Sequence, residues 1–226
     1  MENEYIKRDY KRPSKELVEG FRQVTAATAH EAMGRKYYID SSIRPLYDGM
    51  KVCGPALTCQ CPEMDNLTLH AALHIAEPGD VIVCTLGDYA EQGPFGDCLA
   101  TSAMARGIEG LVVNTCVRDG EDIHKMGFNV FCKGHCINGT IKNAFGHIGY
   151  PLAIGGQVVN PGDIIIGDDD GLVVVPLEIA EEVLEKCLAK MKKEDETRAL
   201  FRTGVSSWEK NHFSDLCKAK GYNIDI

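Results

Sequence analysis

Two apolar runs with a more polar segment between them form the clearest pattern in the chain. Residues 81–86 and 110–117 are rich in β-branched side chains over the length of a strand, as is typical of strands buried on both faces. Residues 97–106 have the length of a helix that connects two parallel strands. The order strand, helix, strand therefore predicts a parallel βαβ unit with a right-handed crossover.

Further helices and strands are predicted on both sides of this unit. Apolar spacing and turn signals indicate them at residues 13–24, 26–33, 51–60, 66–76, 129–132, 155–159, 164–166 and 172–175. A long amphipathic helix is expected after Pro176, and residues 205–221 are expected to form a last helix that begins at Ser206 or Ser207. We therefore predict one α/β domain over residues 1–226, with N-terminal helices and a C-terminal helical extension.

Length and charge restrict the possible partners. With 226 residues the chain is long enough for one substantial core. A formal net charge of −9 argues against a nucleic-acid-binding surface. No apolar run approaches the length of a membrane span, and the N-terminus lacks the pattern of a secretion signal. We expect a cytoplasmic protein that binds neither nucleic acid nor membranes.

The ten cysteines are interpreted as reduced thiols. The closest pair, Cys59 and Cys61, does not have the Cys-x-x-Cys spacing of zinc or redox motifs. Cys84 and Cys187 lie inside apolar runs, where a thiol behaves as a small hydrophobic group. Cys98 differs, because it follows the predicted start of a helix, a position that lowers the pKa of a thiol and allows a nucleophilic role.

Two groups of side chains have the composition of a metal site. Three consecutive carboxylates, Asp168 to Asp170, suggest a cation site, but Asp170-Gly171 between two β-branched runs is also a strong hairpin signal, which we favour. His70 and His74 are one helical turn apart, a spacing that can bind a metal. No third ligand lies nearby in the sequence, and surface or core histidines are the favoured interpretation.

The most informative candidate site lies where the parallel strands end. Parallel strands place their C-terminal ends at one edge of a sheet, and ligands of open α/β sheets bind there. The helix that begins near Asp97, with Asp97 as its predicted N-cap, starts at the same edge. The backbone amides of Asp97, Cys98 and Leu99 have no partners inside that helix and could bind a carboxylate or phosphate.

Charged residues follow the second strand at this edge. Arg118 can bind an anionic substrate through two aligned donors, and Asp119 can bind a hard divalent cation. The alternative is that both are exposed residues of a turn. The loop before the helix, with Tyr89, Glu91 and Gln92, is expected to shape the pocket.

Several segments spread along the chain match one known family. They are Cys53–Ala56, Asp65-Asn66, Gly79–Val83, Gly96–Thr101, Arg106-Gly107, Gly110–Val113, Arg118-Asp119, Thr140 with Lys142, Gly155-Gly156, Pro161–Asp163 and Asp168–Gly171. The chain thereby resembles the RraA-like family over about residues 20–200, which leaves residues 201–226 as a helical tail. The resemblance implies a layered α/β/β sandwich of the swivelling-domain type around the central βαβ unit.

The resemblance also implies a reaction. Members of the family include lyases that cleave a C–C bond of a 2-oxo acid, by retro-aldol cleavage of 4-hydroxy-4-methyl-2-oxoglutarate or by decarboxylation of oxaloacetate, through a pyruvate enolate. By this analogy Asp119 would hold Mg²⁺ or Mn²⁺, and Arg118 would bind the keto oxygen or a carboxylate. Gly96, Asp97, Cys98 and Leu99 would bind the substrate, and Asp97 would also orient a water near the metal.

The resemblance has two further implications. Relatives form trimers and hexamers in which an acid from the neighbouring subunit approaches the metal, and Glu194 is the nearest match, so a homotrimer or hexamer is expected. Other members are non-catalytic regulators of ribonuclease activity. The regulator type lacks an acid after the arginine, and the presence of Asp119 therefore favours the enzyme.

Overall fold

The structure is a computed structural model that describes residues 4–224. Its centre is a mixed sheet with the strand order β1-β5-β4-β3-β2-β9-β10, in which β6 also pairs with β2. The strands of this sheet are Arg44–Pro45 (β1), Val52–Cys61 (β2), Val81–Leu86 (β3), Gly110–Val113 (β4), Asn129–Cys132 (β5), His147–Ile148 (β6), Ile164–Asp168 (β9) and Gly171–Val175 (β10). A separate hairpin consists of Leu152–Ile154 (β7) and Gln157–Val159 (β8).

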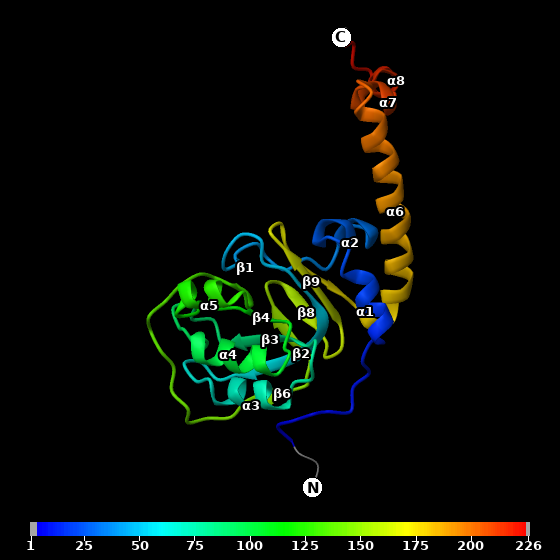
Figure 1. Cartoon of the computed structure of the whole chain (residues 1–226). Helices are drawn as coiled ribbons and strands as arrows, with labels where there is room; N and C mark the ends of the chain where they lie inside the picture. Colours follow the sequence, from blue (N-terminus) through cyan, green and yellow to red (C-terminus); the bar gives the residue numbers. More distant parts are fainter. Residues whose placement is uncertain (1–3, 225–226) are drawn as a thin grey trace.

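The helices lie in two groups (Figure 1). Their bounds are Lys15–Phe21 (α1), Ala26–Ala32 (α2), Leu67–Ile75 (α3), Asp97–Ala105 (α4), Gly120–Met126 (α5), Ala180–Phe201 (α6), Ser207–Lys210 (α7) and Phe213–Ala219 (α8), with a short 3-10 turn at Leu177–Ile179. Helices α3, α4 and α5 cover one face of the parallel strands, whereas α1, α2 and α6 pack near β9 and β10. The outer half of α6 extends away from the body and carries α7 and α8 at its tip.

Alternation along the central strands divides the core into two layers. Ile82 and Cys84 of β3 belong to the layer beneath α3 and α4. Val81 and Val83 face the opposite layer, which the β7–β8 hairpin helps to close. Because both faces are buried, the strand is apolar along its whole length, which explains the uninterrupted apolar run in the sequence.

The predicted βαβ unit is confirmed. Strands β3 and β4 are parallel, with Val81 opposite Gly110, and α4 connects them. Their C-terminal ends, and that of β2, therefore lie at one edge of the sheet. The predicted fold class, a layered α/β domain with N-terminal helices and a C-terminal helical extension, is confirmed as well.

The carboxylates before Gly171 belong to a hairpin. Strands β9 and β10 pair antiparallel around this turn, as the favoured interpretation predicts. The carboxylate of Asp168 accepts a hydrogen bond from the backbone N–H of Ala26 at 2.9 Å, and that of Asp169 accepts one from Gly49 at 2.6 Å. Both carboxylates therefore tie the turn to neighbouring segments.

The last predicted helix is wrong in one respect. Residues 205–221 form two short helices instead of one, because His212 adopts a left-handed conformation with φ of 52° between α7 and α8. Of the two predicted caps, Ser206 and Ser207, the structure has Ser206, whose side chain accepts a hydrogen bond from the backbone N–H of Glu209 in a capping box.

The structure bears on the expectations about membrane spans, the secretion signal and the cysteines. Across residues 4–224, none of the helices combines the length and apolarity that crossing a bilayer requires. The secretion-signal argument concerns in part residues 1–3, which lie outside the described residues. The cysteines are free thiols, as predicted, and most of them are buried.

Candidate functional site

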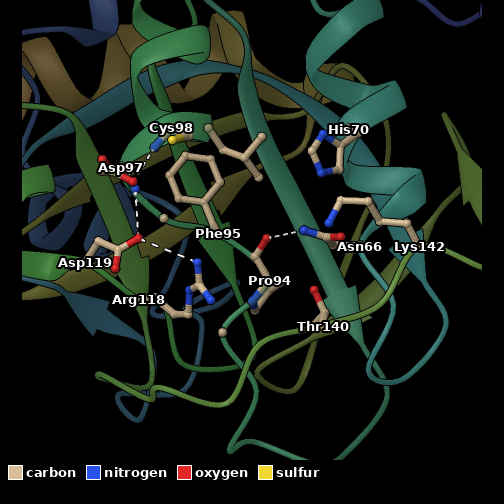
Figure 2. A pocket seen from close by; sticks show the side chains of 13 residues that line it. Asn66, His70, Pro94, Phe95, Asp97, Cys98, Arg118, Asp119, Thr140 and Lys142 are labelled. Carbon is tan, nitrogen blue, oxygen red and sulfur yellow. Dashed lines mark hydrogen bonds and ion pairs between the residues drawn. The ribbon is translucent and has the colours of Figure 1, made fainter.

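A cavity of about 210 Å³ opens at the edge where the parallel strands end (Figure 2). Its walls come from the N-terminus of α4 with the loop before it, the turn between β4 and α5, the first turns of α3 and the loop around residue 140. The lining residues are Asn66, His70, Gly93, Pro94, Phe95, Gly96, Asp97, Cys98, Leu99, Arg118, Asp119, Thr140 and Lys142. The structure thus brings together the candidate site residues that the sequence analysis assigns to one and the same chain: Gly96, Asp97, Cys98, Leu99, Arg118 and Asp119.

The backbone of Asp119 directs its carboxylate toward α4. Asp119 is the N-cap of α5, yet its side chain makes no capping hydrogen bond there. Its backbone is left-handed, with φ of 52°, a conformation that few residues other than glycine adopt but that aspartate tolerates. The carboxylate instead accepts a hydrogen bond from the backbone N–H of Asp97 at 3.4 Å. The acid is therefore turned away from its own helix and toward the cavity.

Arg118 lies beside this carboxylate. Its backbone N–H donates to the carbonyl of Phe95 at 2.9 Å, which fixes the start of the side chain. The guanidinium is 3.9 Å from the Asp119 carboxylate, and the Arg118 side chain is 46% exposed, so a ligand can reach it. A methyl group at Gly93 would collide with the Arg118 side chain. The loop before α4 is thus shaped around the arginine.

The helix start differs from the prediction. Gly96, not Asp97, is the N-cap of α4, and Asp97 is its first residue. The Asp97 side chain accepts a hydrogen bond from the N–H of Cys98 at 2.7 Å. Two of the three predicted anion-binding amides, those of Asp97 and Cys98, therefore already face protein carboxylates. A substrate anion at this helix end would have to replace them.

The prediction for Cys98 is also wrong. The hydrogen bond with Asp97 and the charge of that carboxylate raise the pKa of the Cys98 thiol instead of lowering it. A raised thiol pKa disfavours the thiolate that a nucleophile needs. Cys98 contributes its backbone N–H to the site through the hydrogen bond to Asp97.

The opposite end of the cavity is formed by side chains that the sequence interpretation did not place in the site. Asn66, His70, Thr140 and Lys142 lie across Pro94 and Phe95 from Asp97, Arg118 and Asp119 (Figure 2). The amide nitrogen of Asn66 donates to the carbonyl of Pro94 at 2.6 Å, while its oxygen is buried and has no hydrogen-bond partner among residues 4–224. Burial and the nearby Lys142 charge lower the pKa of His70, which favours its neutral form. The sequence did offer a signal for three of these residues, because Asn66, Thr140 and Lys142 lie in segments that match the family.

Asp65 holds these two segments together. Its carboxylate accepts hydrogen bonds from the backbone N–H groups of Asn143 at 2.6 Å, Ala144 at 2.8 Å and Leu67 at 2.9 Å. Burial alone would raise the pKa of Asp65, but these three amides lower it. The carboxylate thereby ties the loop that carries Lys142 to the start of α3.

The loop before α4 shapes the cavity, as expected, but it does so through Gly93, Pro94 and Phe95, whereas Tyr89, Glu91 and Gln92 do not line the cavity. Gln92 is fully buried: its oxygen accepts from the N–H of Met64 at 2.7 Å, and its nitrogen donates to the carbonyl of Leu86 at 2.8 Å. Gln92 thus supports the loop from inside, and the loop reaches the cavity through Gly93 to Gly96.

The remaining candidate metal ligands lie elsewhere. His74 is exposed and, unlike His70, does not line the cavity. Glu194 lies on the outer part of α6, where it pairs with Lys190 at 2.8 Å and Arg198 at 3.4 Å. Its predicted role depends on a neighbouring subunit and stays a prediction.

The donor set at Asp119 fits a hard divalent cation. Mg²⁺ binds oxygen ligands and commonly takes only one or two protein carboxylates, keeping several waters. Asp119 presents a carboxylate that its own helix does not use, with Asp97 beside it.

Comparisons with known proteins find related sequences and related structures. The RraA-like family model, described as Aldolase/RraA, matches residues 25–174. A protein of Halalkalibacterium halodurans, named as a proposed 4-hydroxy-4-methyl-2-oxoglutarate aldolase, is 34% identical over 183 residues, which cover 81% of this chain and 87% of that protein. Protein DlpA of Legionella pneumophila is 34% identical over 169 residues, covering 72% of this chain but 28% of that protein.

A solved structure shows the same fold. The crystal structure of Streptomyces coelicolor RraAS2, described as an unusual member of the RNase ES inhibitor RraA protein family, has a TM-score of 0.76 and 32% identity. The match covers 84% of this chain and 98% of that one.

Proposed function

The chain belongs to the RraA-like family, and on that premise we propose that it is a divalent-metal-dependent lyase that cleaves a C–C bond of a 2-oxo acid. Retro-aldol cleavage of 4-hydroxy-4-methyl-2-oxoglutarate and decarboxylation of oxaloacetate are the two candidate reactions. Both leave the same pyruvate enolate. The observation that carries the proposal is the meeting of Asp119, Arg118 and the start of α4 in one cavity.

The catalytic problem in either reaction is the negative charge of the enolate. Donors fixed in place before the reaction stabilise such charge best, because they need no reorganisation. Arg118 is anchored through its backbone to Phe95 and carries a guanidinium that a ligand can reach. It is suited to bind the keto oxygen together with the adjoining carboxylate through two donors.

Asp119 and Asp97 supply negative charge beside this arginine. A divalent cation held by Asp119 would supply Lewis acidity next to the keto oxygen when bound. Asp97, which lies at the first position of α4, would orient polar groups around it. The carboxylate of Asp119 also lies 3.9 Å from the Arg118 guanidinium.

The far end of the cavity indicates a second acidic group on the substrate. Lys142 provides a cation there, and the hydroxyl of Thr140 provides a hydrogen-bond donor. With Arg118 at one end and Lys142 at the other, a small dicarboxylic 2-oxo acid fits the distribution of charge. Both candidate substrates belong to this class.

The proposal includes the expected assembly of several copies of the chain. We propose a homotrimer or hexamer in which α6, whose outer half extends from the body, packs on another copy. Glu194 lies on that part of α6 and would approach the cavity of the neighbour.

A non-catalytic regulator of ribonuclease activity is the second candidate. The 32% identity to a member of the RNase ES inhibitor RraA family favours it. The presence of Asp119 beside Arg118 favours the enzyme, since a protein-binding surface has no need for a carboxylate turned into a cavity.

Pyruvate release separates the two candidates. The purified chain is incubated with oxaloacetate or with 4-hydroxy-4-methyl-2-oxoglutarate, with Mg²⁺ and then with excess chelator. The lyase releases pyruvate from at least one substrate, and chelator stops the release. Absence of pyruvate from both substrates, together with inhibition of a ribonuclease by the same preparation, would establish the regulator instead.

A further inference from the structure

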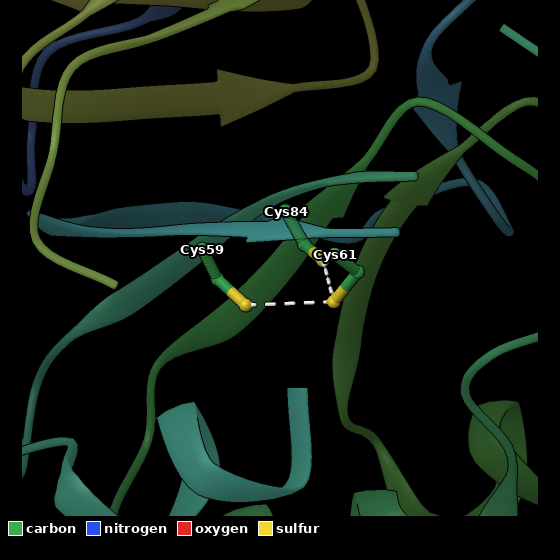
Figure 3. A group of neighbouring side chains, drawn as sticks. All are labelled: Cys59, Cys61 and Cys84. Atoms are coloured by element: carbon green, nitrogen blue, oxygen red, sulfur yellow. Dashed lines mark hydrogen bonds between the residues drawn. The ribbon is translucent and has the colours of Figure 1, made fainter. Parts of the chain in front are cut away.

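A second group of chemically reactive side chains lies in the core beneath α3. It consists of the thiols of Cys59, Cys61 and Cys84 (Figure 3). Pairing of β2 with β3 places Cys59 directly opposite Cys84, and Cys61 follows two residues along β2. Because side chains alternate along a strand, all three sulfurs point to the same face of the sheet.

The sulfurs are close enough to share one ion. The Sγ atom of Cys61 is 3.7 Å from that of Cys59 and 3.7 Å from that of Cys84, and all three lie within 4.8 Å of one another. A point equidistant from all three is therefore about 2.1–2.4 Å from each, which matches the ~2.3 Å length of a metal–thiolate bond. Binding would need no rearrangement of the strands.

The start of α3 lies against this group. Leu69 and Ala72 of α3 belong to the same buried core layer as the three cysteines, so the sulfurs lie between the sheet and the helix.

We propose that Cys59, Cys61 and Cys84 form a binding site for a soft, thiophilic ion that is stable with three sulfur ligands, such as Cu(I) or trivalent arsenic. Sulfur ligands select soft ions and exclude Mg²⁺ and Ca²⁺. Zinc prefers four ligands, and within residues 4–224 this group supplies three, in a core closed to water. Three-coordinate ions are therefore the class that fits.

Charge balance favours trivalent arsenic within this class. Cu(I) held by three thiolates would leave a net charge of −2 after release of three protons. Arsenous acid exchanges its three hydroxyl groups for three thiols and releases three waters, which leaves a neutral site. A neutral product suits a buried position, since an isolated charge there is costly.

Entry is from the side of α3. Cys61 ends β2 at the edge of the sheet that carries the cavity and is 4% exposed, whereas Cys59 and Cys84 are fully buried. A local opening of the first turns of α3, a short helix at the surface, would admit the ion. The site is separate from the proposed active site and does not depend on its function.

Retention of ions by the intact chain tests the proposal. Reduced protein is mixed with Cu(I), or in a second arm with arsenite, then passed over a desalting column, and copper or arsenic is measured per chain. We expect one ion per chain and at least about a tenfold loss in Cys84→Ala, where a ligand is removed. X-ray absorption of the loaded protein should show three sulfur neighbours, and the two arms distinguish the ions.

Matched controls exclude other thiols and misfolding. Cys187→Ala removes a buried thiol of a different core layer, and the double variant Cys116→Ser/Cys136→Ser removes thiols nearer the surface. Both should retain the ion. Cys59→Ala serves as a second ligand variant, and circular dichroism establishes that each variant folds. Failure of the wild type to retain either ion, or full retention by folded Cys84→Ala and Cys59→Ala, would overturn the proposal.

Discussion

The carboxylate of Asp119 occupies the space that a side chain at position 96 would need. A methyl group built on Gly96 would collide with an oxygen of that carboxylate, so glycine at the N-cap of α4 and the inward turn of Asp119 depend on each other. The backbone of Gly96 is extended, with φ of −148°, a conformation open to any residue. The glycine is therefore required by the close approach of Asp119 rather than by backbone strain.

Replacing Gly96 tests this relationship. Gly96→Ala should lower kcat/KM for pyruvate release by about 100-fold, because the displaced Asp119 carboxylate no longer meets the reacting atoms. The fold should persist, since the added methyl meets one side chain at the surface of the cavity. Steady-state kinetics measure the loss. Ser102→Ala, an exposed position on the same helix, should behave as wild type. Wild-type kinetics of Gly96→Ala would contradict the proposed position of Asp119.

Arg118 should depend on the shape of its guanidinium as well as on its charge. Arg118→Lys keeps the charge but loses the paired donors, and should lower kcat/KM by about 10–100-fold. Arg106→Lys, which changes an exposed arginine at the end of α4, should have no such effect. Equal activities of the two variants would show that Arg118 acts only as a point charge or not at all.

Lys142 should affect substrate binding more than the bond cleavage. Lys142→Gln removes the cation at the far end of the cavity, so KM for a dicarboxylic 2-oxo acid should rise about tenfold while kcat changes little. Lys133→Gln, an exposed lysine outside this cavity, is the matched control. A drop in kcat with unchanged KM would place Lys142 at the reacting centre instead.

Asp65 should make the stability of the protein sensitive to acid. Because three backbone amides lower the pKa of Asp65 in the folded state, its contribution is complete at neutral pH and is lost as the pH falls below the usual carboxyl range of about 4. Asp65→Asn should cost about 1–3 kcal/mol in the free energy of unfolding at neutral pH. The difference from wild type, measured by urea denaturation, should shrink as the solution is acidified. A difference that stays constant with pH would exclude the ionised Asp65 as its cause.

Local patterns were sufficient to predict the part of the fold that carries half of the site. The lengths of the apolar runs predict β3, α4 and β4, and parallel pairing then brings Asp97 and Asp119 to one edge. The turn at Gly171 follows from its residue types in the same way. These features are determined by residues that are close together in the sequence, so the sequence alone is enough to predict them.

The other half of the site depends on contacts between distant segments. Lys142 reaches the cavity because Asp65, more than seventy positions earlier, binds the backbone of its loop. Gln92 supports the pocket from inside the core, although its polarity suggests a position in the wall. The pKa of Cys98 follows from the side chain of Asp97, which outweighs the start of the helix. Such outcomes are decided by tertiary packing and need the structure.

The measurement that tests the account most directly is Mg²⁺-dependent pyruvate release by Asp119→Asn compared with wild type. The amide keeps the size of the side chain but removes the charge that would hold a divalent cation. We expect wild type to release pyruvate from oxaloacetate or 4-hydroxy-4-methyl-2-oxoglutarate, and Asp119→Asn to lose at least about 100-fold of kcat/KM with its fold and assembly unchanged. Full activity of Asp119→Asn, in the presence of Mg²⁺ or of chelator, would contradict the central role of this carboxylate.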